Sequence, residues 1–132
     1  MTQRDYELGH AELDVLKVLW NGPRAGLPVR TVMNALHERG RRVAYTTVQT
    51  ILTRLEQKGF VASDKTGPAF IYKAAVRKAD VFRSRTRTLL DQLYDGAAGP
   101  LVLQLVRSRR LTPGELAELQ RLIEELDLPD PN

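Results

Sequence analysis

The 132-residue sequence contains no cysteine and only two histidines, and these absences exclude several classes of function. Without thiols the chain has no disulfide, no thiolate nucleophile and no cysteine-ligated metal site. His10 and His37 stand far apart and lack partners at ligand spacing, so we expect no metal site and no cofactor. Glycine-rich phosphate loops and paired-carboxylate motifs are also missing, so we predict that the protein is not an enzyme.

Long apolar runs are missing as well. No segment approaches the roughly 20 apolar residues that a membrane-spanning helix needs. Residues 1–5, Met-Thr-Gln-Arg-Asp, do not begin a signal peptide. We therefore expect a cytoplasmic protein without membrane insertion.

The net charge of +4 is unevenly distributed. Residues 1–77 hold 12 Lys and Arg against 7 Asp and Glu, whereas residues 78–132 hold 8 against 9. A basic front half joined to a nearly neutral back half indicates that the front half meets a polyanion.

Apolar residues at helical spacing predict helices in the front half. The first begins at Gly9, where Glu12 is placed to accept a hydrogen bond from the cap N–H, and it ends at residues 21–23. The second covers residues 29–39. We predict that residues 24–28 form only a connector between them.

The third helix, which begins at Tyr45 and ends at Gly59, has two contrasting faces. Its inner stripe at positions i, i+3, i+4 and i+7 consists of Val48, Ile51, Leu52 and Leu55. The outer face carries threonines, a glutamine and an arginine, and no acid precedes Glu56. Such groups donate to phosphates and base edges without electrostatic repulsion. Threonine is also a mediocre helix former, so helix propensity does not explain this face. The sequence therefore predicts a DNA-recognition helix.

After this helix, apolar residues recur at every second position instead of at helical spacing. Residues 61–64 and 69–73 alternate around a Gly-Pro turn, which predicts a β-hairpin. Three helices followed by a hairpin form a winged helix-turn-helix, predicted over residues 8–75. The fold class that we expect is mainly α with a small β-hairpin wing, with residues 1–77 as the DNA-binding domain.

Residues 78–132 are predicted to form a helical dimerisation domain of three helices. Thr112, Pro113 and Glu115 form a capping box at the start of the last one. About 50 residues are too few to build a core of their own. We therefore expect the apolar stripes to pack against a second copy, and the alternative is that they fold back on the winged helix. The expected interface residues are Phe82, Leu89, Leu93, Leu101, Leu105, Leu116, Leu119, Leu122 and Ile123.

The N-terminal half of a recognition helix enters the major groove of DNA. The expected contacts are therefore Tyr45, Thr46, Thr47, Gln49, Thr50 and Arg54 on the helix, Arg41 and Arg42 before it, and Lys65 and Thr66 in the wing. Arg54 is placed to reach either a phosphate or a guanine. For Tyr45 the alternative is packing against the first helix, and for Arg41, Arg42 and Lys65 it is a solvated surface charge.

Several segments of the chain resemble the penicillinase-repressor (BlaI/MecI) family. They are residues 11–13, 18–20, 46–55, 58–60, Tyr72, 93–96 and 111–116, with the block from Thr47 to Gly59 as the most specific part. The resemblance implies a homodimeric repressor in which each winged helix contacts half of an inverted repeat in double-stranded DNA. It also implies control of β-lactamase-type or related operons.

The same resemblance implies a membrane sensor protease that leads to cleavage of the repressor. Family members with that mechanism are cut at an Asn-Phe bond, whereas this chain has Gln104-Leu105 at the matching place. The cysteine motifs of the copper-responsive relatives are absent. The alternative function is a winged-helix protein-interaction module without sequence-specific DNA binding, which would need an exposed apolar patch on the third helix.

Overall fold

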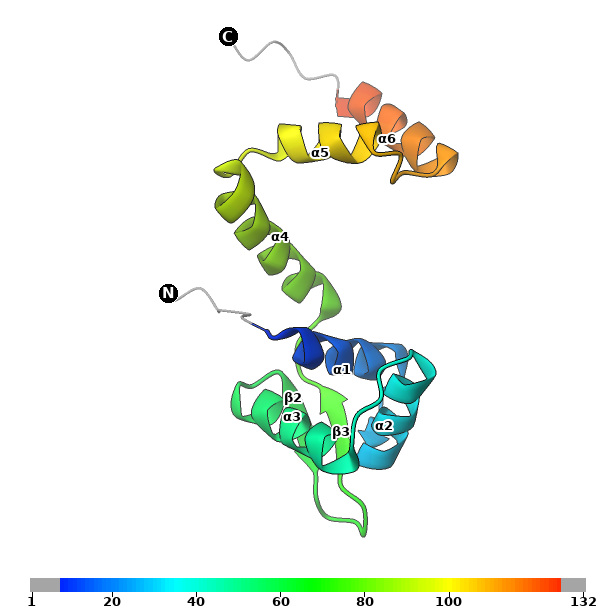
Figure 1. Ribbon diagram of the computed structural model, residues 1–132, viewed down its shortest axis with the longest axis vertical. Helices are drawn as coiled ribbons and strands as arrows, with labels where there is room; N and C mark the ends of the chain where they lie inside the picture. The colour runs from blue at the N-terminus through cyan, green and yellow to red at the C-terminus, as the bar shows by residue number, and fades with distance from the viewer. Residues whose placement is uncertain (1–7, 127–132) are drawn as a thin grey trace. The chain divides into compact units, whose positions relative to one another are not determined.

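The computed structural model describes residues 8–126, and its helices and the two strands of its hairpin follow the predicted order (Figure 1). The chain divides into two compact units, Met1–Arg85 and Thr86–Asn132. The elements are α1 (His10–Asn21), β1 (Leu27–Pro28), α2 (Val29–Glu38), α3 (Tyr45–Gln57), β2 (Val61–Asp64), β3 (Ile71–Ala74), α4 (Lys78–Tyr94), α5 (Ala98–Arg107) and α6 (Pro113–Leu126). The predicted fold class, mainly α with a small β wing, is confirmed.

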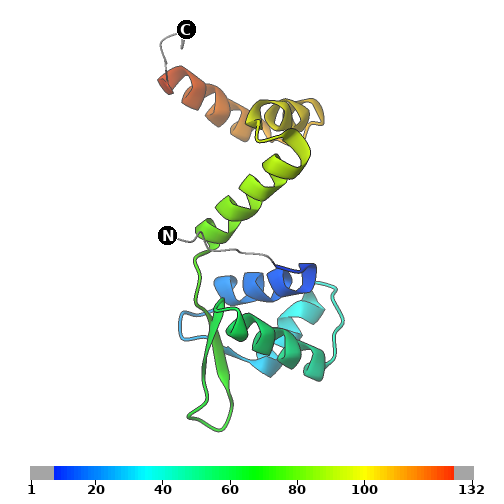
Figure 2. The same cartoon turned by 90° about the vertical axis from the view of Figure 1, so that its left-hand side faces the viewer.

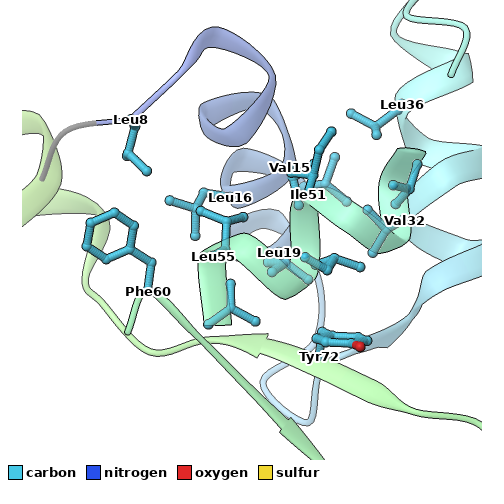
Figure 3. Close-up of a cluster of buried hydrophobic side chains, with 14 of the residues drawn as sticks. Leu8, Val15, Leu16, Leu19, Val32, Leu36, Ile51, Leu55, Phe60 and Tyr72 are labelled. Atoms are coloured by element: carbon cyan, nitrogen blue, oxygen red, sulfur yellow. The ribbon is translucent and has the colours of Figure 1, made fainter. Parts of the chain in front are cut away.

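The core of the first unit lies between α1, α2, α3 and the hairpin (Figure 3). All four residues of the predicted inner stripe of α3 are buried, which confirms its amphipathic pattern. Phe60, which directly precedes β2, and Tyr72 in β3 are buried in the same core. Because these apolar groups are removed from water together, they hold the outer face of α3 in a fixed orientation.

The start of α1 confirms the predicted capping arrangement. The Gly9 N–H donates to Oε1 of Glu12 at 2.8 Å. The Lys58 ammonium at the end of α3 contacts both carboxylate oxygens of Glu12 at 2.9 Å. Burial raises the pKa of Glu12, but these hydrogen bonds and the positive charge outweigh it and lower the pKa below its ordinary value of 4.5.

The connector predicted over residues 24–28 is partly wrong, because it contains the short strand β1. β1 pairs antiparallel with β3, with Leu27 opposite Tyr72 and Pro28 opposite Ile71, and the sheet order is β1-β3-β2. Gly26 precedes β1 with a φ of +100°, and a Cβ there would lie 2.6 Å from the Tyr72 carbonyl oxygen. Only glycine permits this close approach of the two backbones.

The predicted hairpin is confirmed. β2 and β3 pair antiparallel from Val61 opposite Ala74 to Asp64 opposite Ile71. The second strand begins at Ile71 rather than at residue 69. Phe70 is therefore part of the turn region of the wing.

The first turns of α4 pack on the winged helix. Val81 is fully buried, and the Phe82 ring meets the Trp20 ring edge-on at 5.8 Å between centroids. The Nη1 group of the Arg85 guanidinium donates a hydrogen bond to the Leu8 carbonyl oxygen at 3.0 Å. The first compact unit consequently extends to Arg85, past the residue 77 at which we placed the domain boundary. The predicted boundary refers to independently folding domains and stays a prediction.

In the second unit the predicted capping box of α6 is confirmed. The Thr112 N–H donates to Glu115 Oε1 at 2.8 Å, and the Glu115 N–H donates to Thr112 Oγ1 at 3.1 Å. α5 begins at Ala98 and ends at Arg107. The Tyr94 hydroxyl donates to Gln104 Oε1 at 2.6 Å and joins the end of α4 to α5.

Candidate nucleic-acid interface

The outer face of α3 is exposed along its whole length. Thr46, Thr47, Gln49, Thr50 and Arg54 are all exposed, and each lies opposite the buried stripe. Tyr45 is the one large apolar side chain exposed on α3. The face therefore offers polar groups rather than the apolar patch that a protein-interaction module would need.

The N-terminus of α3 is open to a ligand. Its N-cap is Ala44, and within residues 8–126 no side chain hydrogen-bonds to the N–H groups of this cap. The first turn also contains no acidic residue. Unpaired N–H groups and the positive end of the helix dipole bind phosphate well.

Two of the α3 threonines use their hydroxyl hydrogen within the helix. Thr50 Oγ1 donates to the Thr46 carbonyl oxygen, and Thr53 Oγ1 donates to the Gln49 carbonyl oxygen, both at 2.9 Å. The Thr50 hydroxyl can still accept a hydrogen bond, and its methyl group can contact a thymine methyl. Gln49 keeps the donor and acceptor pair that suits adenine.

Arg30 is a residue of this surface that the sequence analysis missed. It lies in the first turn of α2, and its guanidinium carbon is 5.5 Å from the centroid of the Tyr45 ring. The Tyr45 side chain is 39% exposed. A guanidinium stacked on an aromatic ring keeps its edge free to hydrogen-bond a phosphate. The sequence offered one clue to this role, because Arg30 is an arginine on the polar side of the helix that precedes α3.

The two arginines before α3 differ in their surroundings. Nε of Arg41 lies 2.5 Å from Oδ2 of Asp14 in α1, so its charge is already paired. Arg42 is exposed and has no ion pair with any residue of 8–126. The structure thus favours Arg42 over Arg41 as a group available to a phosphate.

The wing is a mixture of charges and one aromatic ring. Lys65 Nζ lies 3.7 Å from Glu56 Oε1 and 5.6 Å from the centroid of the Phe70 ring. The Thr66 N–H and hydroxyl both donate to Asp64 Oδ1, at 3.0 and 2.6 Å, and these bonds lower the pKa of Asp64. Phe70, which is 43% exposed, is a second residue that the sequence analysis missed.

Most of the residues predicted for a dimer interface are exposed apolar side chains. Phe82 is 39% exposed but packs on Trp20. In the second unit, Leu101 and Leu119 are half-buried, and exposed positions are Leu89, Leu93, Leu105, Leu116, Leu122 and Ile123. No residue from 86 to 125 is buried, so these helices lack a core of their own.

Two further properties restrict the chemistry of the described part of the chain. Residues 8–126 hold no group of three His, Cys, Asp or Glu that is arranged to bind a metal. No helix in this range is long and apolar enough to cross a membrane.

The sequence is similar to known repressors over nearly its whole length. The family model described as penicillinase repressor matches residues 8–125. The penicillinase repressor of Bacillus licheniformis is 28% identical over 90% of this chain and 91% of its own, and the methicillin resistance regulatory protein MecI of Mammaliicoccus sciuri is 26% identical over 95% and 99%. A solution structure of the DNA-binding domain of the repressor BlaI is 29% identical, covers 61% of this chain and 93% of that chain, and has a TM-score of 0.49.

Proposed function

The chain belongs to the penicillinase repressor family and is a DNA-binding transcriptional repressor rather than an enzyme, and we propose that two copies bind an inverted-repeat operator. Each copy contacts one half-site with α3 and the wing. The single observation that carries this proposal is the outer face of α3, which is exposed, free of acids before Glu56 and open at its N-terminus. That combination suits a duplex, whose groove edges and phosphates accept hydrogen bonds.

In this proposal the first turn of α3 sets the position of the helix on DNA. Its N–H groups and Arg42 bind phosphates, and the Arg30–Tyr45 pair adds a further cation beside them. Thr46, Thr47 and Gln49 then face base edges in the major groove. Phosphate contacts fix the register and supply most of the affinity, whereas the base contacts supply the specificity.

Two copies are proposed because the second unit cannot bury its own apolar side chains. Leu93 is 67% exposed and Ile123 is 60% exposed. A second copy covers such a surface, and a two-fold dimer presents two recognition helices to an inverted repeat. Half-sites about 10 base pairs apart, or a multiple of this spacing, are then expected.

We extend the proposal to β-lactamase-type or related operons because relatives carry the names penicillinase repressor and methicillin resistance regulatory protein. A cytoplasmic location and a membrane sensor protease as partner belong to the same proposal. The family cleavage pair is replaced by Gln104-Leu105, inside α5, where Gln104 accepts the hydrogen bond from Tyr94. Proteases prefer exposed loops, so cleavage at this bond requires local unfolding of α5.

The test is a titration of a labelled promoter fragment from upstream of the protein's own gene, at two salt concentrations and against scrambled competitor DNA. We expect saturable binding that survives the competitor. The logarithm of the affinity should fall with the logarithm of salt concentration, by a slope of about −0.9 for each neutralised phosphate. Equal binding to the scrambled duplex at all salt concentrations would contradict sequence-specific recognition of this operator.

Arg54→Ala tests the contact face itself. If Arg54 binds a guanine, the variant loses on the order of 1–3 kcal/mol of binding free energy on the operator and far less on scrambled DNA. If Arg54 binds a phosphate, both duplexes lose affinity alike. Arg83→Ala on α4, which removes the same charge away from α3, is the matched control. An Arg54→Ala variant that binds both duplexes like the parent would show that Arg54 has no role in binding.

A further inference from the structure

A cavity of about 410 Å³ lies in the first unit, away from the outer face of α3. It is open to solvent on one side and is lined by the end of α1, the connector that follows α1, the end of β3 and the start of α4. Leu19, Trp20 and Val76 give it an apolar floor. A volume of this size is within the range of small-molecule sites, which combine apolar walls with a few polar groups.

The rim of the cavity is cationic. Arg24, Lys73, Arg77 and Lys78 line it, all four are exposed, and no carboxylate is among the lining residues described. The nearby carboxylate of Asp80 does not line the cavity, and it is already bound by Arg77 at 3.0 Å. Arg77 is paired in this way, so Arg24, Lys73 and Lys78 are the cations beside the apolar floor whose positive potential attracts an anion.

The aromatic floor has no polar group to offer. The indole N–H of Trp20 donates to the Val76 carbonyl oxygen at 3.0 Å, which also ties the end of α1 to the end of β3. The Trp20 ring is held by the edge-on contact with Phe82. A ligand therefore meets a fixed apolar ring, and its polar recognition depends on the surrounding guanidinium and ammonium groups.

This cavity is separate from the DNA-binding surface. The turn between β2 and β3 points away from α1, whereas β3 ends beside α1 (Figures 1 and 2). The cavity lies at that end of β3, and the wing tip with Lys65 lies at the other. The cations at the cavity are thus not part of the set that we assign to DNA.

We propose that the cavity binds a small organic anion, a carboxylate attached to a flat apolar body. The carboxylate pairs with Arg24 and Lys78, and the apolar body covers Trp20 and Val76. Charge-assisted hydrogen bonds give the anion its affinity, and the apolar floor discriminates against inorganic anions. Neither half of the site is sufficient alone, so an apolar neutral molecule and a bare anion both bind more weakly.

The full-length chain offers a direct probe, because Trp20 is its one tryptophan. Tryptophan fluorescence is titrated with benzoate, with benzyl alcohol as the neutral match and with inorganic phosphate as the match without an apolar body. We expect a saturable change with benzoate at a Kd at least about tenfold below those of the other two. Isothermal titration calorimetry under the same conditions repeats the comparison independently of the tryptophan signal.

A pair of double variants assigns the binding to the cavity. Arg24→Gln with Lys78→Gln removes two rim cations, and we expect the benzoate Kd to rise by at least about tenfold. Arg83→Gln with Arg87→Gln removes the same charge from exposed positions of α4 that do not line the cavity, and should leave the Kd unchanged. Circular dichroism checks that both variants are folded.

Several results would overturn the proposal. Benzoate that produces no saturation in fluorescence and no heat in calorimetry would show that the cavity does not bind this class. Equal affinity for benzyl alcohol would exclude the role of the cations, and equal affinity for phosphate would exclude the role of the apolar floor. Equal effects of the two double variants would place the binding elsewhere on the chain.

Discussion

The two compact units of this chain differ most in what they bury. The unit that ends at Arg85 contains every buried apolar residue from Leu8 to Val81, whereas no residue from 86 to 125 is buried. Both units consist of amphipathic helices of similar length. In the first unit the helices and a small sheet surround one hydrophobic core (Figure 3). In the second unit the apolar side chains of the helices stay exposed or half-buried.

In the dimer that we propose, this difference assigns DNA binding to the first unit and association to the second. The proposed DNA-binding face is held in place within a single copy, because the inner stripe of α3 is packed in the core. The proposed interface is incomplete in a single copy, because its apolar side chains are covered only when a second copy binds.

The largest effect is expected from placing charges on the exposed stripes of the second unit. Leu93→Asp with Ile123→Asp should convert a dimer into monomers, because two buried carboxylates at an interface are costly. Operator affinity should fall by on the order of 10²–10⁴-fold, since linked binding of two half-sites is lost. Sedimentation velocity and operator titration measure the two effects.

The control for that variant carries the same charge at polar positions of the same two helices. Gln92→Asp with Gln120→Asp should stay dimeric, because both side chains are exposed and polar. A monomeric parent protein would refute the dimer proposal itself. A Leu93→Asp/Ile123→Asp variant that still sediments as a dimer would place the interface elsewhere.

A core truncation should act on the first unit instead. Leu16 is fully buried, and Leu16→Ala should lower the free energy of unfolding by about 2–5 kcal/mol through lost burial and a cavity. Urea unfolding followed by Trp20 fluorescence measures it. Leu103→Ala, at an exposed position of α5, should change stability by less than about 0.5 kcal/mol. Similar losses for the two variants would contradict the contrast between the units.

The capping box of α6 provides a smaller effect. Thr112→Ala removes the acceptor for the Glu115 N–H, and we expect a loss of about 1 kcal/mol in the stability of the second unit. Thermal unfolding monitored by far-ultraviolet circular dichroism measures it, with Thr86→Ala on α4 as the control. A loss no larger than that of the control would show that α6 does not depend on its cap.

The smallest effect is a pH dependence from Glu12. Its folded-state pKa lies below the ordinary value of 4.5, so its contribution to stability is complete above that value. The contribution is lost as the pH falls through the lowered folded-state pKa. Glu12→Gln should therefore flatten this part of the curve of stability against pH, measured by urea unfolding between pH 7 and acid conditions. An unchanged acid limb would show that Glu12 does not contribute.

The sequence predicted most of the elements because their causes are local. The stripe of α3, the cap at Gly9 and the box at Thr112 each depend on residues within a few positions of one another. β1 was missed because a two-residue strand with a proline has no periodicity, and it exists only through its pairing with β3. Such long-range pairings are not visible in the pattern of one segment.

The same limit applies to the candidate site. The pairing of Arg41 with Asp14 and the stacking of Arg30 on Tyr45 each join residues from different helices. Residue type and spacing identified the outer face of α3, because that face belongs to a single helix. They did not distinguish Arg41, which is paired with a carboxylate, from Arg42, which is available to a phosphate. That distinction depends on how α1, α2 and α3 pack.

A selection of binding sites from random duplex DNA with the full-length protein tests most directly whether two copies bind an inverted repeat. We predict that the selected duplexes share an inverted repeat, with half-site centres about 10 base pairs or a multiple of this apart. Such a result requires both sequence-specific contact by α3 and two copies in symmetric arrangement. Selected duplexes without a shared motif would contradict sequence-specific contact by α3, and a single unrepeated motif would contradict the binding of two symmetric copies.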